Sequence, residues 1–411
     1  MKVLVFGGSG KMGQSVAFDL AKDDAVEQIG LVGRHPDALK KAKAWLKSKK
    51  VVLHPHDVDD RRATMKLMKG YDVGVSTLPD RHTSYAMGHA AVESGLSYVD
   101  MLEEYHRRPD LYELEGLKLP RGVDLYGYGD WLHETAKKNG VTFMDGIGFA
   151  PGLSNITCGE AIRVLDKAEI CIARVGGIPR KDVAEHKPLK YMITWAFWHV
   201  LREYSVKLYI LKNGKRVEVD ATTEREAFRF DKYGHDEMLE CAITPGMPSF
   251  MYTRPKLKYF AEKTVRWPGH WAGVQTLKEC GLLNIEPVVV NGQKVVPRDL
   301  LLACIEPQLT RKPGETDVCV MYNTVTGIKD GKPTKISYWM WDEADKKNGI
   351  SSMGRVTGFP AAIGAVMIGK GMIKEKGIVP PEDCIYGDNY AYFADELKKR
   401  HIHILESIET M

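Results

Sequence analysis

The opening of the chain constrains its fold more than any other segment. A β-rich run at 2–6, KVLVF, stops at the glycine-rich turn GGSGKMG, and apolar residues then recur with helical spacing over 11–22. Gly8, Gly10 and Gly13 therefore form the pattern G-x-G-x-x-G between a predicted strand and a predicted helix. This placement is typical of a turn that binds the phosphates of a nucleotide.

The chemistry of the turn explains the glycine spacing. The first glycine permits a tight turn, the second lets the backbone approach a pyrophosphate, and the third lets the helix pack against the strand. The free N–H groups at the helix N-terminus then hold the anion. We predict dinucleotide binding here, the alternative being a scaffold that no longer binds its ligand. The predicted contacts are Gly8, Ser9, Gly10, Lys11, Met12 and Gly13.

Apolar runs alternate with helix-like stretches through residues 1–150. This alternation predicts a parallel sheet with helices on both faces, a Rossmann-type doubly wound α/β domain whose ligands bind at the carboxyl ends of the strands. The predicted strands are 2–6, 28–33, 51–58, 71–78, 96–101 and 141–146, and the predicted helices are 11–22, 37–48, 59–69, 84–94 and 130–139. Further cofactor contacts are predicted at strand ends, at Asp57, Val58, Ser76, Thr77, Leu78, Pro79 and Asp100.

The end of the second predicted strand bears on the choice of dinucleotide. NAD-binding domains usually have an acidic residue there, which binds the ribose 2′-hydroxyl. This chain instead has Gly33 followed by Arg34, and a guanidinium can bind a 2′-phosphate by two hydrogen bonds. We therefore predict that NADP(H) is favoured over NAD(H), with a solvated loop arginine as the alternative reading.

Composition argues against several classes of partner. The chain has 58 basic and 54 acidic residues, well mixed, so nucleic-acid binding is not expected. Seven cysteines lie far apart without a C-x-x-C pair, and His54 and His56 are interpreted as solvated, so no metal is predicted. The most apolar late stretch meets Lys370 after about a dozen residues, too few to cross a bilayer. A cytoplasmic protein with a small-molecule substrate, assembled as a homodimer or higher homo-oligomer, is expected.

Beyond residue 151 the periodicity changes. Residues 168–179 and 206–219 are predicted strands, the second containing an Asn-Gly hairpin signal. The aromatic-rich stretch 188–205 is predicted to be helical over its later part, and 263–283 and 351–373 each read as a loop before a helix. These features predict a separate α+β domain.

Residues 102–129 are long for a connection within a doubly wound domain. They are interpreted as a surface excursion, with a lid over the active site as the alternative. Four tyrosines lie in this segment, Tyr105, Tyr112, Tyr126 and Tyr128.

Several motifs, taken in order, resemble the saccharopine dehydrogenase-like family. They are GGSGKMG, GFAPGLSN, VGGIP, TVRWPGH, SSMGRVTGFPAAI and GIVPPED. The resemblance implies a Rossmann domain interrupted by a second α+β domain for substrate binding and dimerisation, with C-terminal helices that return to the first. It implies a dinucleotide domain over 1–150 and 350–411 and a substrate domain over 151–349.

Within the family, two residues separate the branches. Saccharopine reductases and carboxynorspermidine dehydrogenases, which act on secondary amines, typically have Asp before the Pro-Gly of the loop after the sixth predicted strand. The saccharopine reductases also have Cys before the paired glycines of the next strand. This chain has Ala150 and Val175 there. It is more similar to lysine 6-dehydrogenases, which share APGLSN and the stretches matching Pro188–Trp195 and Arg266–His270. Arg34 departs from the acidic residue that many lysine 6-dehydrogenases carry.

The resemblance implies oxidation of a primary amine with hydride transfer to a nicotinamide. His270 is the preferred proton carrier and Asp100 a second catalytic candidate, with a turn brace and a loop cap as the respective alternatives. Gly148, Phe149 and Ala150 are expected to border the nicotinamide. The substrate-binding candidates are Arg266, Tyr98, Gly176, Gly177, Tyr191 and Thr357. The alternatives in function are a reductase that forms a secondary amine from an amine and an aldehyde, and a non-catalytic cofactor-binding scaffold.

Overall fold

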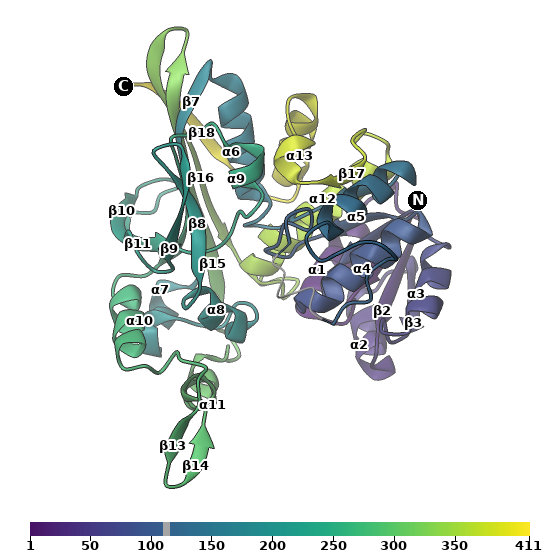
Figure 1. Ribbon diagram of the computed structural model, residues 1–411, viewed down its shortest axis with the longest axis horizontal. Coiled ribbons are helices and arrows are strands. Elements are labelled where there is room, and N and C mark those ends of the chain that lie inside the picture. The colour runs from purple at the N-terminus through teal and green to yellow at the C-terminus, as the bar shows by residue number, and fades with distance from the viewer. Residues whose placement is uncertain (110–115) are drawn as a thin grey trace. The chain divides into compact units, whose positions relative to one another are not determined.

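The computed structural model describes residues 1–109 and 116–411, which form two compact units (Figure 1). The first unit comprises 1–160, 247–249 and 354–401, and the second comprises 161–246, 250–353 and 402–411. The division thus differs from the predicted boundaries, because the first unit continues to Glu160 and the last ten residues belong to the second unit.

The first unit contains a seven-stranded parallel sheet with the order β17-β6-β5-β4-β1-β2-β3. Six strands lie within the ranges predicted from the sequence, and the seventh, β17, comes from the returning C-terminal segment. The strands are β1 (Lys2–Phe6), β2 (Gln28–Gly33), β3 (Val51–Pro55), β4 (Val73–Ser76), β5 (Ser97–Asp100), β6 (Thr142–Met144) and β17 (Gly377–Val379).

Three helices of this unit, α2, α3 and α4, begin at residues with recognisable helix-start chemistry. Pro36 opens α2, and the carboxylates of Asp60 and Asp80 accept hydrogen bonds from backbone N–H groups in the first turns of α3 and α4. Helices α3, α4 and α5 contact one another in series, whereas α1 contacts α2. This pattern confirms the doubly wound fold. The helices are α1 (Lys11–Leu20), α2 (Pro36–Leu46), α3 (Arg61–Met68), α4 (Arg81–Ser94), α5 (Tyr128–Lys138), α12 (Ser352–Gly369), η3 (Pro381–Asp383) and α13 (Asp388–Lys399).

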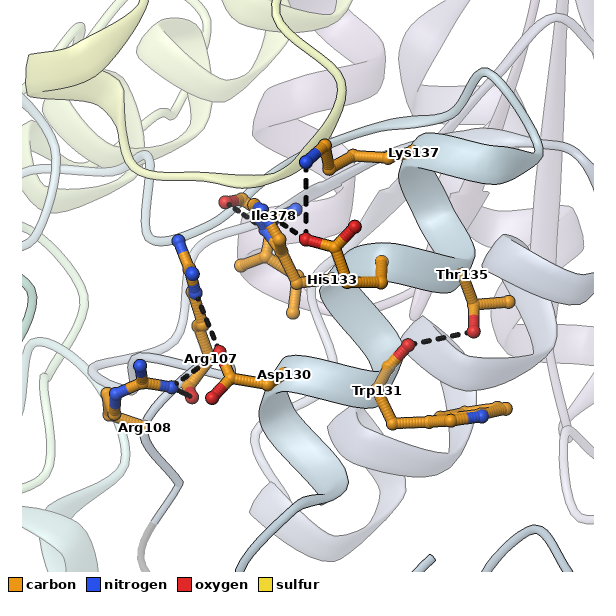
Figure 2. A network of polar contacts seen from close by, with 9 residues as sticks. Arg107, Arg108, Asp130, Trp131, His133, Thr135, Lys137 and Ile378 are labelled. Atoms are coloured by element: carbon orange, nitrogen blue, oxygen red, sulfur yellow. Dashed lines mark hydrogen bonds and ion pairs between the residues drawn. The ribbon is translucent and has the colours of Figure 1, made fainter.

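The excursion after β5 is anchored at both of its ends. Tyr105 is buried, whereas Tyr126 is 83% exposed, and Tyr112 lies outside the described residues. Figure 2 shows that Arg107 and Arg108 both pair with Asp130 of α5, at 3.0 and 2.8 Å. The same helix is joined to β17 through His133 and Ile378 (Figure 2). The start of the segment is therefore tied to α5, and α5 in turn is tied to β17.

The second unit is built on a nine-stranded mixed sheet. Its main path is β10-β11-β12-β7-β15-β16-β18, with β8 and β9 attached to β12, and only the β7–β12 pair is parallel among these described strands. The strands are β7 (Lys167–Pro179), β8 (Lys207–Lys212), β9 (Lys215–Asp220), β10 (Glu226–Phe230), β11 (Glu237–Ile243), β12 (Tyr259–Arg266), β15 (Asp317–Lys329), β16 (Lys332–Glu343) and β18 (Leu405–Thr410). A separate hairpin pairs β13 (Val288–Val290) with β14 (Gln293–Val295).

One prediction for this half needs correction. The predicted hairpin at 206–219 is confirmed as β8 and β9. The predicted loop at 263–266 is instead the end of β12, which lies between β11 and β7 in the sheet. The remaining helices are α6 (Leu153–Val164), α7 (Lys181–Ala184), η2 (Pro188–Lys190), α8 (Phe197–Glu203), α9 (Phe250–Thr253), α10 (His270–Glu279) and α11 (Pro297–Leu309).

Within 1–109 and 116–411, no helix is long and apolar enough to cross a membrane. The same residues contain no group of three or more His, Cys, Asp or Glu side chains arranged to hold a metal ion. His54 and His56, interpreted from the sequence as solvated, are part-buried and hydrogen-bonded to Tyr71 and Thr64.

Candidate active site

The strand order places the predicted dinucleotide contacts together. From β1 the chain runs outward to β2 and β3, and β4 then starts on the other side of β1. The crevice at such a reversal is where ligands bind in open α/β sheets. The glycine turn after β1 and the segment Ser76–Pro79 after β4 both lie at this point.

The turn has the geometry that a bound pyrophosphate requires. Gly10 N–H donates to Gly7 O at 2.9 Å, which closes the turn. A Cβ at Gly13 would lie 2.3 Å from Gly7 O, so this position has no room for any side chain. Helix α1 begins without a side-chain cap and without an acidic residue in its first turn. Its first N–H groups and positive dipole end therefore fit an anionic ligand.

The neighbouring strand end braces the turn. Thr77 Oγ1 donates to Phe6 O at 2.8 Å, and Leu78 lies beside Gly7. The Thr77 hydroxyl is thus engaged with the backbone of the turn, which gives it a positioning role there.

Arg34, predicted to bind the 2′-phosphate, follows β2, and the predicted cofactor contacts Asp57 and Val58 follow β3. Arg34 is exposed and follows Gly33, the last residue of β2. Ser9 Oγ lies 3.3 Å from where a Cβ on Gly33 would stand, so the glycine turn and this corner are adjacent. Asp57 is exposed in the loop that follows β3, beside Val58.

The loop after β6 is compact. Ile147 N–H donates to Asp100 O at 2.8 Å, and Gly148 N–H donates to Pro151 O at 2.8 Å. Gly152 has φ +130°, and a Cβ there would lie 2.1 Å from Gly148 O. Thr357 Cγ2 is 3.0 Å from the Cβ position of Gly148, so Thr357 lies next to the loop that carries Phe149 and Ala150.

Asn155 holds this loop, a role that the sequence did not predict. Its Oδ1 accepts from Gly152 N–H at 3.0 Å, and its Nδ2 donates to Ser249 Oγ at 3.1 Å and to Glu382 Oε2 at 2.9 Å. The three partners come from distant parts of the chain, so no local spacing could have indicated them. The sequence indicated only that this asparagine ends the motif GFAPGLSN.

We expect Asn155→Ala to lower the free energy of unfolding by about 2 to 3 kcal/mol, because it leaves a buried N–H and a buried carboxylate short of partners. Urea denaturation measures the change. Ser154→Ala is the matched control: Ser154 is equally buried, and its hydroxyl makes no hydrogen bond with the described residues. Equal losses in both variants would contradict the role given to Asn155.

Asp100 belongs to a buried chain of polar groups. Its Oδ1 accepts from Leu102 N–H at 2.6 Å, and its Oδ2 accepts from Ser84 Oγ at 2.7 Å. Ser84 Oγ also contacts His106 Nε2 at 3.1 Å, and His106 Nδ1 contacts Asp145 Oδ1 at 2.7 Å. Both oxygens of Asp100 are therefore engaged within the protein, and burial raises the pKa of this carboxyl.

Tyr98, a substrate-binding candidate, lies in the core of the first unit. Its ring packs between Phe6 and Phe143, and the residue is fully buried. Burial raises the pKa of its hydroxyl well above the usual value. The geometry fits the packing role that is usual for a strand tyrosine.

Arg266 and His270 meet at Tyr204 in the second unit, as neighbours in one buried cluster. Arg266 Nε and Nη2 donate to Tyr204 Oη at 3.1 and 2.9 Å, and Nη1 donates to Val265 O at 2.9 Å. The negative charge of Glu203 helps to raise the pKa of Arg266. The three hydrogen bonds named above nevertheless go to neutral oxygens, those of the Tyr204 hydroxyl and the Val265 carbonyl. An arginine has five N–H donors, so two of them make no hydrogen bond with the described residues.

His270 is enclosed by protein on both ring nitrogens. Nδ1 lies 2.8 Å from Leu189 O and therefore carries the proton, which leaves Nε2 to accept from Tyr204 Oη at 3.1 Å. Burial, together with the Arg266 charge, lowers its pKa to about 3. A neutral, doubly bonded imidazole fits a residue that positions Tyr204, and the geometry gives no support to its predicted role as proton carrier.

Two aromatic rings lie near the Arg266 guanidinium. It lies 5.0 Å from the Tyr191 ring centre and 5.9 Å from that of Trp271. Trp271 Nε1 is buried without a hydrogen-bond partner among the described residues. Arg266 is thus bordered by two aromatic rings, and two of its N–H donors make no hydrogen bond with the residues that the structure describes.

The two paired glycines lie in β7 of the same unit. A Cβ on Gly176 would be 2.2 Å from Val265 O, beside Arg266, and one on Gly177 would be 2.3 Å from Met353 Cε and 3.3 Å from Thr194 Oγ1. Close packing therefore accounts for both glycines. Thr357, the remaining substrate candidate, belongs to the first unit.

Comparison with known proteins identifies the family. Residues 3–144 match the saccharopine dehydrogenase NADP binding domain, and residues 148–402 match the saccharopine dehydrogenase C-terminal domain. Carboxyaminopropylagmatine dehydrogenase of Synechocystis is 22% identical over 93% of this chain and 92% of its own length. Saccharopine dehydrogenase [NADP(+), L-glutamate-forming] of Schizosaccharomyces pombe is 22% identical over 84% of this chain and 87% of its own length.

The fold agrees with that assignment. The apo saccharopine dehydrogenase (L-Glu forming) of Saccharomyces cerevisiae has a TM-score of 0.77 and 20% identity, with all of both chains covered. The family resemblance and the fold class predicted from the sequence are thereby confirmed. The chain belongs to the saccharopine dehydrogenase family, as an oxidoreductase with an NADP-binding domain.

Proposed function

We propose that this enzyme oxidises the primary amine of an amino acid with NADP⁺, in the manner of a lysine 6-dehydrogenase. The observation that carries the proposal is the buried Arg266, whose hydrogen bonds go to neutral oxygens and which keeps two N–H donors. A substrate carboxylate is the group that satisfies such a guanidinium, by a bidentate pair. The substrate class is therefore an amine that also carries a carboxylate.

The residues of the first unit fit a dinucleotide. The N–H groups at the start of α1 would hold the pyrophosphate, and Arg34 would hold the 2′-phosphate. When bound, the nicotinamide supplies the acceptor for the hydride that leaves the amine-bearing carbon. The neutral amine that loses this hydride becomes an iminium ion, and water converts the iminium ion to an aldehyde and ammonium. The loop Gly148–Ala150 would border the nicotinamide, and its bare backbone permits close approach.

Ala150 and Val175 support oxidation of a primary amine. They stand where the reductases of the family typically have Asp and Cys. A methyl and an isopropyl group can neither transfer a proton nor bind a second amine substituent. His270 and Asp100 are fully bonded within the protein, so we assign them to positioning Tyr204 and the turn after β5, respectively.

A second candidate is a reductase that joins an amine and an aldehyde into a secondary amine. The names of the relatives favour it, since they include saccharopine dehydrogenases and a carboxynorspermidine synthase of Vibrio alginolyticus. The Arg266 site would serve a carboxylate in this reaction as well. The absence of an acid at position 150 argues against it.

An activity screen separates the two. Purified enzyme is given lysine and related amino acids with NADP⁺ and, in the other direction, NADPH with an amine plus an aldehyde or a 2-oxo acid. We expect NADP⁺ reduction with a single amino acid and release of ammonia. Activity that requires NADPH and two carbon substrates would overturn the proposal in favour of the reductase.

Arg34 sets the cofactor preference in this proposal. We expect Arg34→Ala to weaken NADPH binding about 10- to 100-fold and to leave NADH binding unchanged, because hydrogen bonds to a charged group contribute about 1.5 to 3 kcal/mol. Calorimetric titration with both nucleotides measures the change. Arg62→Ala, another arginine of the same unit, is the control. Preferential NADH binding by the unmodified enzyme would contradict the role of Arg34.

A further inference from the structure

The buried chain Asp145–His106–Ser84–Asp100 crosses the carboxyl ends of two neighbouring strands. Asp100 ends β5, and Asp145 follows β6. His106 binds Asp145 twice, through its backbone N–H to Oδ2 at 2.8 Å and through Nδ1 to Oδ1 at 2.7 Å. His106, Ser84 and Asp100 are fully buried, and Asp145 is 2% exposed.

This chain meets the loop proposed to border the nicotinamide. Asp100 O accepts from Ile147 N–H, and a Cβ on Gly146 would lie 3.6 Å from Leu102 O. Met101 Cβ is 3.6 Å from the Cβ position of Gly148. The turn 100–102 is therefore joined to residues 146–148 by a backbone hydrogen bond, and we expect a shift of the turn to displace this loop.

The protonation state of His106 decides whether the hydrogen bonds of the chain can all be made. A cationic imidazole donates from Nδ1 to Asp145 and from Nε2 to Ser84, which leaves the Ser84 proton for Asp100. A neutral imidazole that keeps its bond to Asp145 has an acceptor at Nε2. The single Ser84 proton then faces two buried acceptors, Asp100 Oδ2 and His106 Nε2. One of these two buried acceptors then stays without a hydrogen bond, which destabilises this arrangement of the chain.

The surroundings of His106 favour the cation. The acidic groups that act on it are Asp145, Asp100 and Glu104, and Glu104 itself pairs with Arg81 at 3.6 Å. The rings of Tyr85 on α4 and of Phe143 on β6 cover the imidazole. Burial lowers its pKa, but the carboxylates outweigh burial and raise the pKa to about 9.

We propose that His106, as a buried imidazolium, is a positioning residue that holds the ends of β5 and β6 in the arrangement that binds the nicotinamide half of the cofactor. The inference rests on the proposed place of the nicotinamide beside the loop Gly148–Ala150. It does not depend on which amine is oxidised, because it concerns cofactor binding alone. Above about pH 9 the imidazolium is lost, and the nicotinamide half is expected to bind less well.

Two ligands separate this role from a general structural one. NADPH has the nicotinamide half, whereas adenosine 2′,5′-bisphosphate has only the half bound by the glycine turn and Arg34. Calorimetric titrations are run at pH 7.5 and pH 9.5, over which range the phosphates stay fully ionised since their second pKa is about 6. For the unmodified enzyme we expect NADPH affinity to fall about threefold at the higher pH, because His106 with a pKa of about 9 is then largely but not fully neutral. The bisphosphate affinity is expected to change much less.

His106→Gln is expected to bind NADPH about tenfold more weakly at pH 7.5, to lose most of the pH dependence and to bind the bisphosphate normally. Ser84→Ala, a smaller change in the same chain, is expected to give the same pattern if His106→Gln folds poorly. His89→Gln is the matched control, because His89 is a buried histidine of the same unit that bonds Glu93 outside this chain. Normal NADPH affinity in both chain variants, or equal weakening of the two ligands, would overturn the proposal. A negative amine screen would not bear on it.

Discussion

Replacing Arg266 by glutamine is expected to lower kcat/KM for a carboxylate-bearing amine by about 100- to 1,000-fold, since losing one partner of a buried charge pair costs about 2 to 5 kcal/mol. The guanidinium is 4% exposed and its hydrogen bonds go to Tyr204 and Val265, so it has N–H donors to give a substrate. Steady-state kinetics with the substrate found in the amine screen measures the loss.

A control variant and a control substrate test whether the loss comes from the substrate carboxylate. Arg216→Gln removes an exposed arginine of the same unit that stacks on Tyr209 and Tyr252, and it should leave kcat/KM unchanged. An amine of the same length without a carboxylate should lose little activity on going from the unmodified enzyme to Arg266→Gln. If both amines lose activity equally, Arg266 supports the cluster around Tyr204 and does not bind the substrate carboxylate.

The sequence predicted the first unit well because its signals are local. Each strand of the parallel sheet is a short apolar run, and the glycines of the opening turn are needed at fixed spacing by backbone geometry alone. The residues at which the strands end were less predictable. The predicted strand ranges included 56–58 and 77–78, but β3 ends at Pro55 and β4 ends at Ser76.

The second unit was harder because its sheet is assembled from distant segments. β18 is the last strand of the chain, yet it pairs with β16, which ends more than sixty residues earlier. No pattern in residues 405–410 predicts that they pair with β16. The resemblance to the family therefore placed the whole C-terminal segment with the first domain, whereas contacts place its last ten residues with the second.

The candidate site shows the same limit at the level of single residues. Arg266 and His270 could be predicted because they lie in one short motif. The group that joins them, Tyr204, lies more than sixty residues away and has no sequence signal of its own. Asn155 and His106 were missed for the same reason, since their importance comes from partners that folding brings to them. The spacing of residues within a sequence motif predicts which side chains are candidates for a site. The burial and the hydrogen bonds of each side chain in the folded protein then decide what that side chain can do.

Gly13→Ala is expected to weaken NADPH binding by about 100-fold or more. In an ordinary helix this change is favourable by about 1 kcal/mol, because alanine has the higher helix propensity. Here the new methyl group would lie 2.3 Å from Gly7 O and 2.7 Å from Gly8 Cα. Both are backbone atoms of the turn that is to hold the pyrophosphate. The helix must therefore move away from β1, and the N–H groups at its start move with it.

The matched control is Gly70→Ala, in the same unit, where the nearest atom to the new methyl is 3.5 Å away. It should bind NADPH normally. Calorimetric titration measures affinity, and thermal unfolding with and without NADPH shows whether Gly13→Ala still folds and has lost the stabilisation that a bound ligand confers. A folded Gly13→Ala variant with unchanged NADPH affinity would mean that the pyrophosphate is not held at the start of α1, and the cofactor would have to be placed elsewhere in the molecule.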